Sequence, residues 1–196
     1  MRRTKEESEQ TRQKIIEAAL SLFSSQGYAN TTFSKIAAEA GCSRGPIYWH
    51  FSNKNELFEE ILSYSQQPLE DLVKETLLLD SSSKAIKHFL SQWIDLLLDD
   101  RRFRESFEIL LNKTELTDAM SRTIKREKKL TDDIIAMFAT LLSLDKKKST
   151  ASIQQRSLLA YTYIMGISQS WLFRPTLFNL REEKAFFIQR LLVLLK

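Results

Sequence analysis

The sequence is poor in the residues that cross-link or interrupt a chain. It contains one cysteine, four glycines and three prolines among 196 residues. Because a single cysteine has no partner within the chain, an intrachain disulfide is excluded, and nothing points to a secreted disulfide scaffold. The scarcity of glycine and proline leaves few strong turn signals, which favours long helices over many short strands.

Histidine and long apolar runs are also scarce. The two histidines, His50 and His88, and Cys42 do not have the spacing of a metal site, so we expect no metal and no cofactor. No glycine-rich phosphate loop or catalytic triad stands out, so the sequence does not indicate an enzyme. The N-terminus lacks the apolar segment of a signal peptide, and the apolar tail at 185–195 is too short to span a bilayer. We therefore expect a cytoplasmic protein with no membrane segment.

The residues that are present suit a packed helical protein. Hydrophobic residues make up 43% of the chain, which is enough for a core, and they recur at helical spacing. The formal net charge of +4 permits binding to nucleic acid but does not require it. We predict an all-α fold with a helix-turn-helix domain at 1–54 and a helical domain for ligand binding and dimerisation at 55–196.

Three helices are predicted in the first 54 residues, at Ser8–Gln26, Phe33–Ala40 and Arg44–His50. Gly27 supplies a stop for the first helix. The second and third helices are separated by the short turn 41–43, and two short helices joined in this way are typical of a helix-turn-helix. A glycine turn between two helices is common, so the turn alone is weak evidence.

The third predicted helix has the composition of a recognition helix, which enters the major groove of DNA. Ile47 and Phe51 lie four residues apart and are expected to anchor it in the core. Arg44, Tyr48 and Trp49 are then free to point outward, and arginine can donate two hydrogen bonds to a guanine edge. The alternative is that the two aromatic residues are plain core.

Other residues in this region are candidates for phosphate or backbone contacts with DNA. Each of them lies near a predicted helix end. Each is either a small residue or carries a hydroxyl, an imidazole or an ammonium group. A histidine at such a position is also compatible with capping a helix. The complete predicted DNA-binding set is Thr31, Thr32, Arg44, Gly45, Tyr48, Trp49, His50 and Lys54.

The stretch from Thr31 to Lys54 closely resembles the N-terminal domain of TetR-family repressors, and Tyr48-Trp49-His50-Phe51 resembles the AcrR-like branch. The resemblance extends from about Met1 to Leu62. It implies that the residues matching Arg44, Gly45, Tyr48, Trp49, His50 and Lys54 touch DNA. Pro46 departs from the small residue often found at its position, which leaves a base contact there open.

The remainder of the chain is predicted to be helical. A fourth helix follows Ser52 or Asn53, and Pro68 is expected to kink or end it. The further predicted helices are Ser83–Leu98, Arg102–Asn112, Leu116–Leu144, Thr150–Phe173 and Arg181–Leu195. The lysine run at 146–148 is expected to form a loop.

Two segments of this second part, 108–115 and 166–180, also resemble AcrR-like proteins. Those relatives repress drug-efflux operons and bind varied aromatic, often cationic, compounds inside this domain. The resemblance implies that an effector pocket is lined by Leu62, Gln66, Phe107, Leu110, Leu111, Tyr161, Ile164 and Met165. Met165 stands where some relatives carry a carboxylate. Apolar and aromatic residues at helical spacing are also typical of plain core.

The last two predicted helices are expected to form a dimer as a four-helix bundle between two subunits. Gly166, Ser168 and Ser170 are small enough for close helix approach. A stripe on the last helix would complete the interface, unless it is intrachain core. The stripe comprises Phe187, Arg190, Leu191 and Leu194.

Together these features predict a homodimeric transcriptional repressor. It would bind a palindromic DNA operator, be released by a small hydrophobic or aromatic effector, and control a multidrug efflux operon. One alternative is a related regulator, or an activator, that senses a specific metabolite. Another, from a different class, is an all-helical interaction module or enzyme whose helix-turn-helix is incidental.

Overall fold

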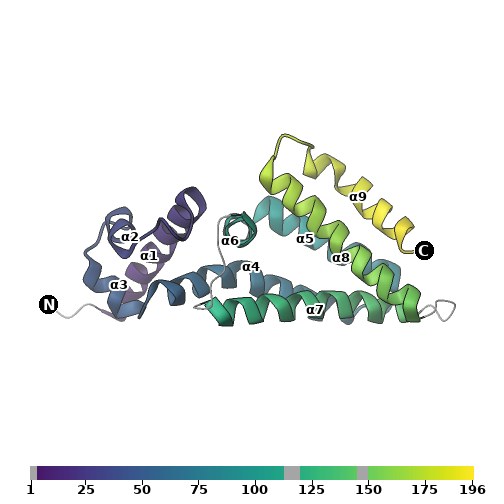
Figure 1. Ribbon diagram of the computed structural model, residues 1–196, viewed down its shortest axis with the longest axis horizontal. Coiled ribbons are helices and arrows are strands. Elements are labelled where there is room, and N and C mark those ends of the chain that lie inside the picture. Colours follow the sequence, from purple (N-terminus) through teal and green to yellow (C-terminus); the bar gives the residue numbers. More distant parts are fainter. Residues whose placement is uncertain (1–3, 113–119, 145–149) are drawn as a thin grey trace. The chain divides into compact units, whose positions relative to one another are not determined.

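The computed structural model describes residues 4–112, 120–144 and 150–196. These residues form nine α-helices and no strand, so the predicted all-α class is confirmed (Figure 1). The predicted helix start at Leu116 and the predicted loop at 146–148 lie outside the described residues. Within the described ranges, no helix is both long and apolar enough to cross a membrane.

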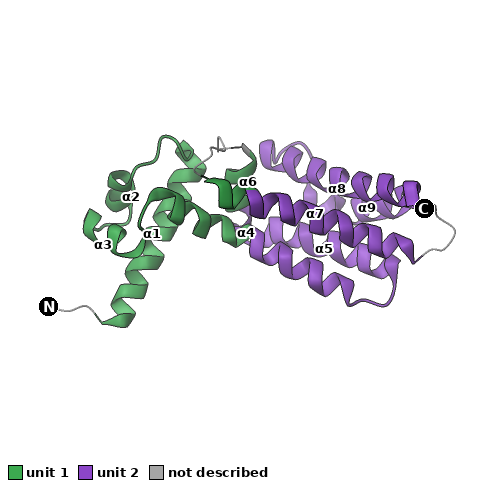
Figure 2. Ribbon diagram, turned by 60° about the horizontal axis from the view of Figure 1, so that its bottom comes forward, with its two compact units in different colours: residues 1–65, 105–124 green, residues 66–104, 125–196 purple. Residues whose placement is uncertain are grey.

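The chain folds into two compact units, which Figure 2 distinguishes by colour. Unit 1 comprises residues 1–65 and 105–124, and unit 2 comprises residues 66–104 and 125–196. The division falls inside three helices, which are α4 (Lys54–Leu77), α6 (Arg101–Asn112) and α7 (Ser121–Ser143). The domain boundary predicted after residue 54 coincides with the first residue of α4 and stays a prediction.

Unit 1 begins with α1 (Lys5–Gln26), which starts three residues earlier than predicted. The reason is a capping box at its N-terminus, where the Thr4 hydroxyl accepts a hydrogen bond from the Glu7 backbone N–H at 3.1 Å. The Glu7 carboxylate accepts one in return from the Thr4 N–H at 2.9 Å. This pairing satisfies backbone donors that the first turn of a helix leaves free.

The next two helices follow the prediction closely. They are α2 (Phe33–Glu39) and α3 (Arg44–His50), and the bounds of α3 are those that the sequence predicted. Gly41, in the turn between them, adopts a φ of +65°, which glycine accepts without steric cost. Cys42, the only cysteine of the chain, is half-buried in the same turn.

The core of unit 1 joins α1, α2, α3 and the start of α4. Phe23, Ile36, Ile47 and Phe58 are all fully buried in one cluster. The rings of Phe23 and Phe58 meet edge to face at 5.7 Å between centroids. Burial of Ile47 and Phe51 confirms the two predicted core anchors of the third helix.

Helix α4 continues through Pro68, so of the two expected outcomes, a kink or an end, the end is wrong, and the kink stays a prediction. Proline in a helix interior removes one hydrogen bond and clashes with the preceding turn. The residues that follow compensate for this cost because Leu69, Leu72 and Val73 are buried in the core of unit 2. Tertiary packing therefore overrides the local signal.

Unit 2 is completed by α5 (Ser82–Asp99), α8 (Thr150–Phe173) and α9 (Leu180–Leu194). Helix α5 packs against α9, and α8 and α9 lie side by side with a short connection between them (Figure 1). Trp93 is buried on α5 and donates its indole N–H to the hydroxyl of Ser168 on α8 at 2.9 Å. This bond satisfies a buried polar group that would otherwise destabilise the fold.

Candidate nucleic-acid interface and effector site

One face of α3 is exposed and carries aromatic and cationic side chains. Trp49 is 81% exposed and Tyr48 is 59% exposed, and Arg44 and Gly45 are exposed as well. The opposite face of α3 packs in the core through Ile47, which is fully buried. The prediction that the two aromatic residues point outward is confirmed, and the alternative that they belong to the core is excluded.

Neighbouring rings hold part of this face in place. The Tyr48 ring meets Phe33 of α2 edge to face at 5.2 Å, which restricts the tyrosine while most of its side chain stays exposed. His50, the last residue of α3, is half-buried, and its ring lies 6.4 Å from that of Phe51. No local sequence pattern marks the role of Phe33, because that role depends on how α2 meets α3.

The two threonines before α2 have different environments. Thr32 is exposed, and its hydroxyl caps α2 by accepting the Lys35 N–H at 3.3 Å. Thr31 is fully buried, and its hydroxyl donates to the Gly27 carbonyl at 2.9 Å. Thr31 thus stabilises the turn, and of the two only Thr32 keeps a side chain accessible to a phosphate.

Lys54 also differs from its predicted environment. Its ammonium group donates hydrogen bonds to the backbone carbonyls of Tyr28 and Thr31, each at 2.9 Å. It also lies 4.0 Å from the centroid of the Tyr28 ring, within cation–π range. Burial lowers the pKa of Lys54. Two of its three N–H donors are therefore used inside unit 1.

The eight predicted effector residues fall in both units. In unit 1, Leu62 and Phe107 are buried, and Leu110 and Leu111 are half-buried. Leu62 belongs to the buried cluster that includes the helix-turn-helix core, and Leu110 packs against that cluster. A lining role for these four residues stays a prediction.

In unit 2, Gln66 and Ile164 are buried, and Tyr161 and Met165 are half-buried. The Gln66 amide donates a hydrogen bond to the carboxylate of Glu127 on α7. The Tyr161 hydroxyl is 3.1 Å from the hydroxyl of Thr131, four residues further along α7. Residues four apart lie on the same helix face, so Gln66 and Tyr161 contact one polar row of α7.

Glu127 was not predicted as a site residue. Burial raises the pKa of its carboxyl group, and the Gln66 hydrogen bond and the charge of Arg126 oppose that shift. The neighbouring Arg126 is engaged elsewhere, because its Nε donates to a Glu70 carboxylate oxygen at 2.7 Å. No sequence pattern marks Glu127, since it stands in a charged stretch typical of a solvated helix face.

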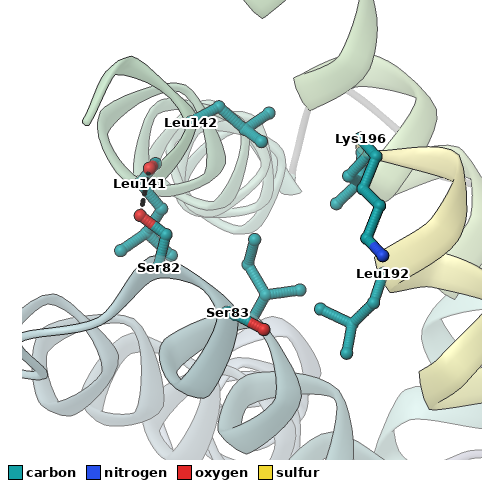
Figure 3. A pocket seen from close by; sticks show the side chains of 8 residues that line it. Ser82, Ser83, Leu141, Leu142, Leu192 and Lys196 are labelled. Carbon is teal, nitrogen blue, oxygen red and sulfur yellow. Dashed lines mark hydrogen bonds between the residues drawn. The ribbon is translucent and has the colours of Figure 1, made fainter. Parts of the chain in front are cut away.

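A pocket of about 320 Å³ opens in unit 2 among α5, α7 and α9 (Figure 3). Ser82, Leu141, Leu192 and Lys196 are among its lining residues, and the Ser82 hydroxyl donates to the Leu141 carbonyl at 2.6 Å. A second, more open depression of about 480 Å³ lies near Trp171. Neither contains any of the eight predicted effector residues.

The outer faces of α8 and α9 expose apolar side chains. Leu159 and Phe173 of α8 and Phe186 and Val193 of α9 are each at least 40% exposed. Gly166 lies on the same side of α8, and a methyl group added there would meet no atom within 4 Å. Contiguous exposed apolar surface is typical of interaction sites, so these side chains are candidates for a contact with a second subunit.

Two expectations about these helices are corrected by burial. Ser168 is not a small surface residue, because its hydroxyl is buried against Trp93 and donates to the Ile164 carbonyl at 2.8 Å. Leu191, expected on the surface stripe, is fully buried within unit 2. Phe187 is half-buried, with its ring 5.2 Å from that of Phe178, and only Arg190 and Leu194 of the stripe are exposed.

Known proteins share both parts of this architecture. Residues 15–61 match bacterial regulatory proteins of the tetR family, and residues 82–196 match the C-terminal region of MAATS-type transcriptional repressors. The HTH-type transcriptional regulator AcrR of Shigella flexneri is 30% identical over 97% of this chain and 92% of its own. The regulator TtgR of Pseudomonas putida is 32% identical over 89% of this chain and 86% of its own.

A solved structure agrees with these matches. NalD, the secondary repressor of the MexAB-OprM multidrug efflux pump in Pseudomonas aeruginosa, is similar with a TM-score of 0.81 and 27% identity, covering 96% of each chain. The fold and the exposed recognition helix define a DNA-binding transcriptional regulator with a helix-turn-helix. The chain belongs to the TetR family of bacterial regulatory proteins.

Proposed function

We propose that this protein is a homodimeric repressor that binds a palindromic operator and controls a multidrug efflux operon. The observation that carries the proposal is the exposed face of α3, where Arg44, Tyr48 and Trp49 project from a helix whose other side is buried. Large aromatic side chains are rarely left in solvent without a partner. Similarity to AcrR and to NalD, named as an efflux-pump repressor, supports the regulated process.

On DNA, Arg44 donates to a guanine edge or a phosphate, and Tyr48, His50 and Thr32 contact the backbone. Gly45 permits close approach of α3 to the duplex. In a two-fold dimer the recognition helices occupy half-sites about 34–36 Å apart, one turn of DNA. A regulator rather than an enzyme follows from this interface and from the relatives, all of which are named as regulators or repressors.

The dimer contact is assigned to the exposed apolar faces of α8 and α9. Leu159, Gly166 and Phe173 lie along one uncharged face of α8, and Phe186 and Val193 add apolar area from α9. Two helices from each subunit would bury these side chains as a four-helix bundle. Gly166, with open space beside it, allows a partner helix to approach closely.

The effector site is assigned to the polar row on α7 with its partners Gln66 and Tyr161. A half-buried aromatic ring and the flexible Met165 suit flat apolar ligands. Glu127 supplies the carboxylate that Met165 does not, so the effector carries a positive charge or a hydrogen-bond donor. Effector binding would release the operator by favouring a conformer with the wrong half-site spacing.

The operator proposal is tested by fluorescence anisotropy on DNA from the protein's own upstream intergenic region. We expect sequence-selective binding that weakens steeply with salt. Arg44→Ala should cost about 1–3 kcal/mol per protomer while the dimer stays intact. The matched control is Arg122→Ala, which removes an 87% exposed arginine outside the interface. Equal affinity of wild type and Arg44→Ala for the selected site would refute the assignment.

The effector proposal is tested with two probes of similar shape, tetraphenylphosphonium and the neutral triphenylphosphine oxide. Calorimetry should show that Glu127→Gln weakens binding of the cation by roughly tenfold and leaves the neutral compound within about twofold. Glu39→Gln, at an exposed position on α2, is the control. Equal effects of Glu127→Gln on both probes would remove the carboxylate from the effector site.

A further inference from the structure

The pocket of about 320 Å³ in unit 2 lies among the start of α5, the end of α7 and the end of α9 (Figure 3). Its walls belong to the core, because Ile86, Leu141, Leu142 and Leu195 are each at most 4% exposed. The Ser82 hydroxyl ties the first turn of α5 to the last turn of α7 through its 2.6 Å bond to the Leu141 carbonyl. The pocket is therefore pre-formed between helix ends that are held together.

The interior of this pocket is aliphatic. Leucine and isoleucine make up five of its eight described lining residues, and none of the eight is aromatic. Side chains beside unfilled space lose the dispersion contacts that a close-packed interior supplies. An alkyl chain that enters the pocket restores these contacts. Ligand pockets typically measure about 300–1,000 Å³, so a pocket near the lower end of that range takes a small molecule.

Polar side chains lie on two walls of the pocket. Ser83 is half-buried on α5, and Lys196 is exposed on the α9 side (Figure 3). Lys196 is the only charged side chain among the described residues that line the pocket. An ammonium group and a hydroxyl both donate hydrogen bonds to an anion, and the ammonium repels a cation. The lining therefore favours a ligand with a negatively charged head group.

This chemistry differs from that of the effector site proposed above. That site combines Tyr161 with the carboxylate of Glu127, which suits a flat ligand with a positive charge or a hydrogen-bond donor. None of the residues assigned to the effector site lines the pocket among α5, α7 and α9. The two sites therefore suit ligands of opposite charge.

We propose that the pocket among α5, α7 and α9 is a second ligand site, which binds a small aliphatic carboxylate. The alkyl chain lies between the leucine walls, and the carboxylate accepts hydrogen bonds from Lys196 and Ser83. The proposal goes beyond the proposed function, because it requires neither an operator nor a dimer. The ligand contacts the ends of three helices, so its binding also stabilises the folded state of unit 2 by mass action.

Octanoate is the probe, and the first measurement locates it in the native protein without DNA. In a titration followed by methyl NMR, octanoate should shift the methyl signals of Ile86, which lines the pocket. The methyl signals of Ile164, one of the predicted effector residues, should stay in place. Ile86 signals that do not move at millimolar octanoate would overturn the proposal, because the pocket would then be empty.

Calorimetry tests the head group by comparing octanoate with the neutral octanol. Lys196→Gln should weaken octanoate binding about fivefold, the upper range for an exposed ion pair, and leave octanol binding nearly unchanged. Lys87→Gln, at an exposed position of α5 outside the lining, is the matched control and should change neither affinity. Equal weakening of both probes in Lys196→Gln would overturn the assignment of an anionic head group.

A substitution that fills the pocket tests the position of the alkyl chain. Leu192→Trp places an indole in the space beside α9 and should lower octanoate affinity at least about tenfold, whereas Leu192→Met keeps the side-chain volume and should not. Unchanged octanoate affinity in folded Leu192→Trp would overturn the site. If Leu192→Trp does not fold, the Ile86 titration of the native protein decides. Failure of octanoate binding leaves the operator proposal intact, because none of these measurements involves DNA.

Discussion

At the scale of single residues, burial determines whether a charged side chain faces solvent or needs partners inside the protein. Lys54 and Glu127 both lie at positions where sequence alone suggests a solvated side chain, and both are partly withdrawn from water. A charge moved from water to a protein interior needs compensation from partners. Lys54 receives it from backbone carbonyls, and Glu127 receives it from Gln66.

Glu127 makes the stability of the protein depend on pH. Burial raises the pKa of its carboxyl group in the folded state above the value in the unfolded chain. The stabilisation from binding the proton is therefore fully present below the unfolded pKa and is lost as pH rises through the folded pKa. Glutamine cannot ionise, so Glu127→Gln avoids that loss.

The expected result is a higher unfolding temperature for Glu127→Gln than for wild type at about pH 8, and no difference near pH 4 or below, where both side chains are neutral. Thermal denaturation across this range measures it, with the exposed Glu39→Gln as control. A gap between Glu127→Gln and wild type that stays constant with pH would contradict a raised pKa in the folded protein.

At the scale of helices, strong local signals in the sequence were sufficient to predict helix bounds. Effects of tertiary packing could not be predicted from the sequence. The bounds of α3 and α8 agree with the prediction because glycine, proline and threonine act as helix start and stop signals there. An end of α4 at Pro68 was expected as one of two outcomes and does not occur, because the benefit of burying the residues after it lies in long-range packing. Thr4 was missed as a cap because the apolar pattern of α1 begins later than its hydrogen bonds do.

The candidate sites show the same difference between local features, which were predicted, and contacts between distant residues, which were not. Helical spacing alone placed Ile47 inside and Tyr48 and Trp49 outside, since these residues lie on opposite faces of one short helix. The partners of Gln66 and Lys54 come from residues more than twenty positions away. Spacing within one segment carries no information on such contacts, so neither the polar row on α7 nor the Lys54 hydrogen bonds to the Tyr28 and Thr31 carbonyls were predictable.

At the scale of the whole molecule, the proposed function depends on two copies acting together. In the proposed dimer each protomer reads one half-site, so the affinity for a complete operator depends on dimer formation. We expect a charged substitution on the apolar face of α8 to break that dimer. Leu159→Glu would set two carboxylates in an apolar contact, which neither partner charges nor water would compensate.

Sedimentation equilibrium should show that Leu159→Glu raises the dimer dissociation constant at least about a hundredfold, or about 2.8 kcal/mol. Operator affinity should fall in parallel. Leu78→Glu is the matched control, because Leu78 is 80% exposed in the connection between α4 and α5, away from that face. An unchanged dimer in Leu159→Glu would place the interface on another surface.

The single cysteine, half-buried in the turn between α2 and α3, allows the native chain to be labelled at one site beside the recognition helix. A nitroxide attached to Cys42 would place one spin label beside the recognition helix of each protomer, with no other thiol to block or mutate. Pulsed dipolar spectroscopy on such a labelled dimer would then report the spacing of the two DNA-reading ends directly. Spectra recorded with and without effector would show whether the distance between the two recognition helices changes when the effector binds.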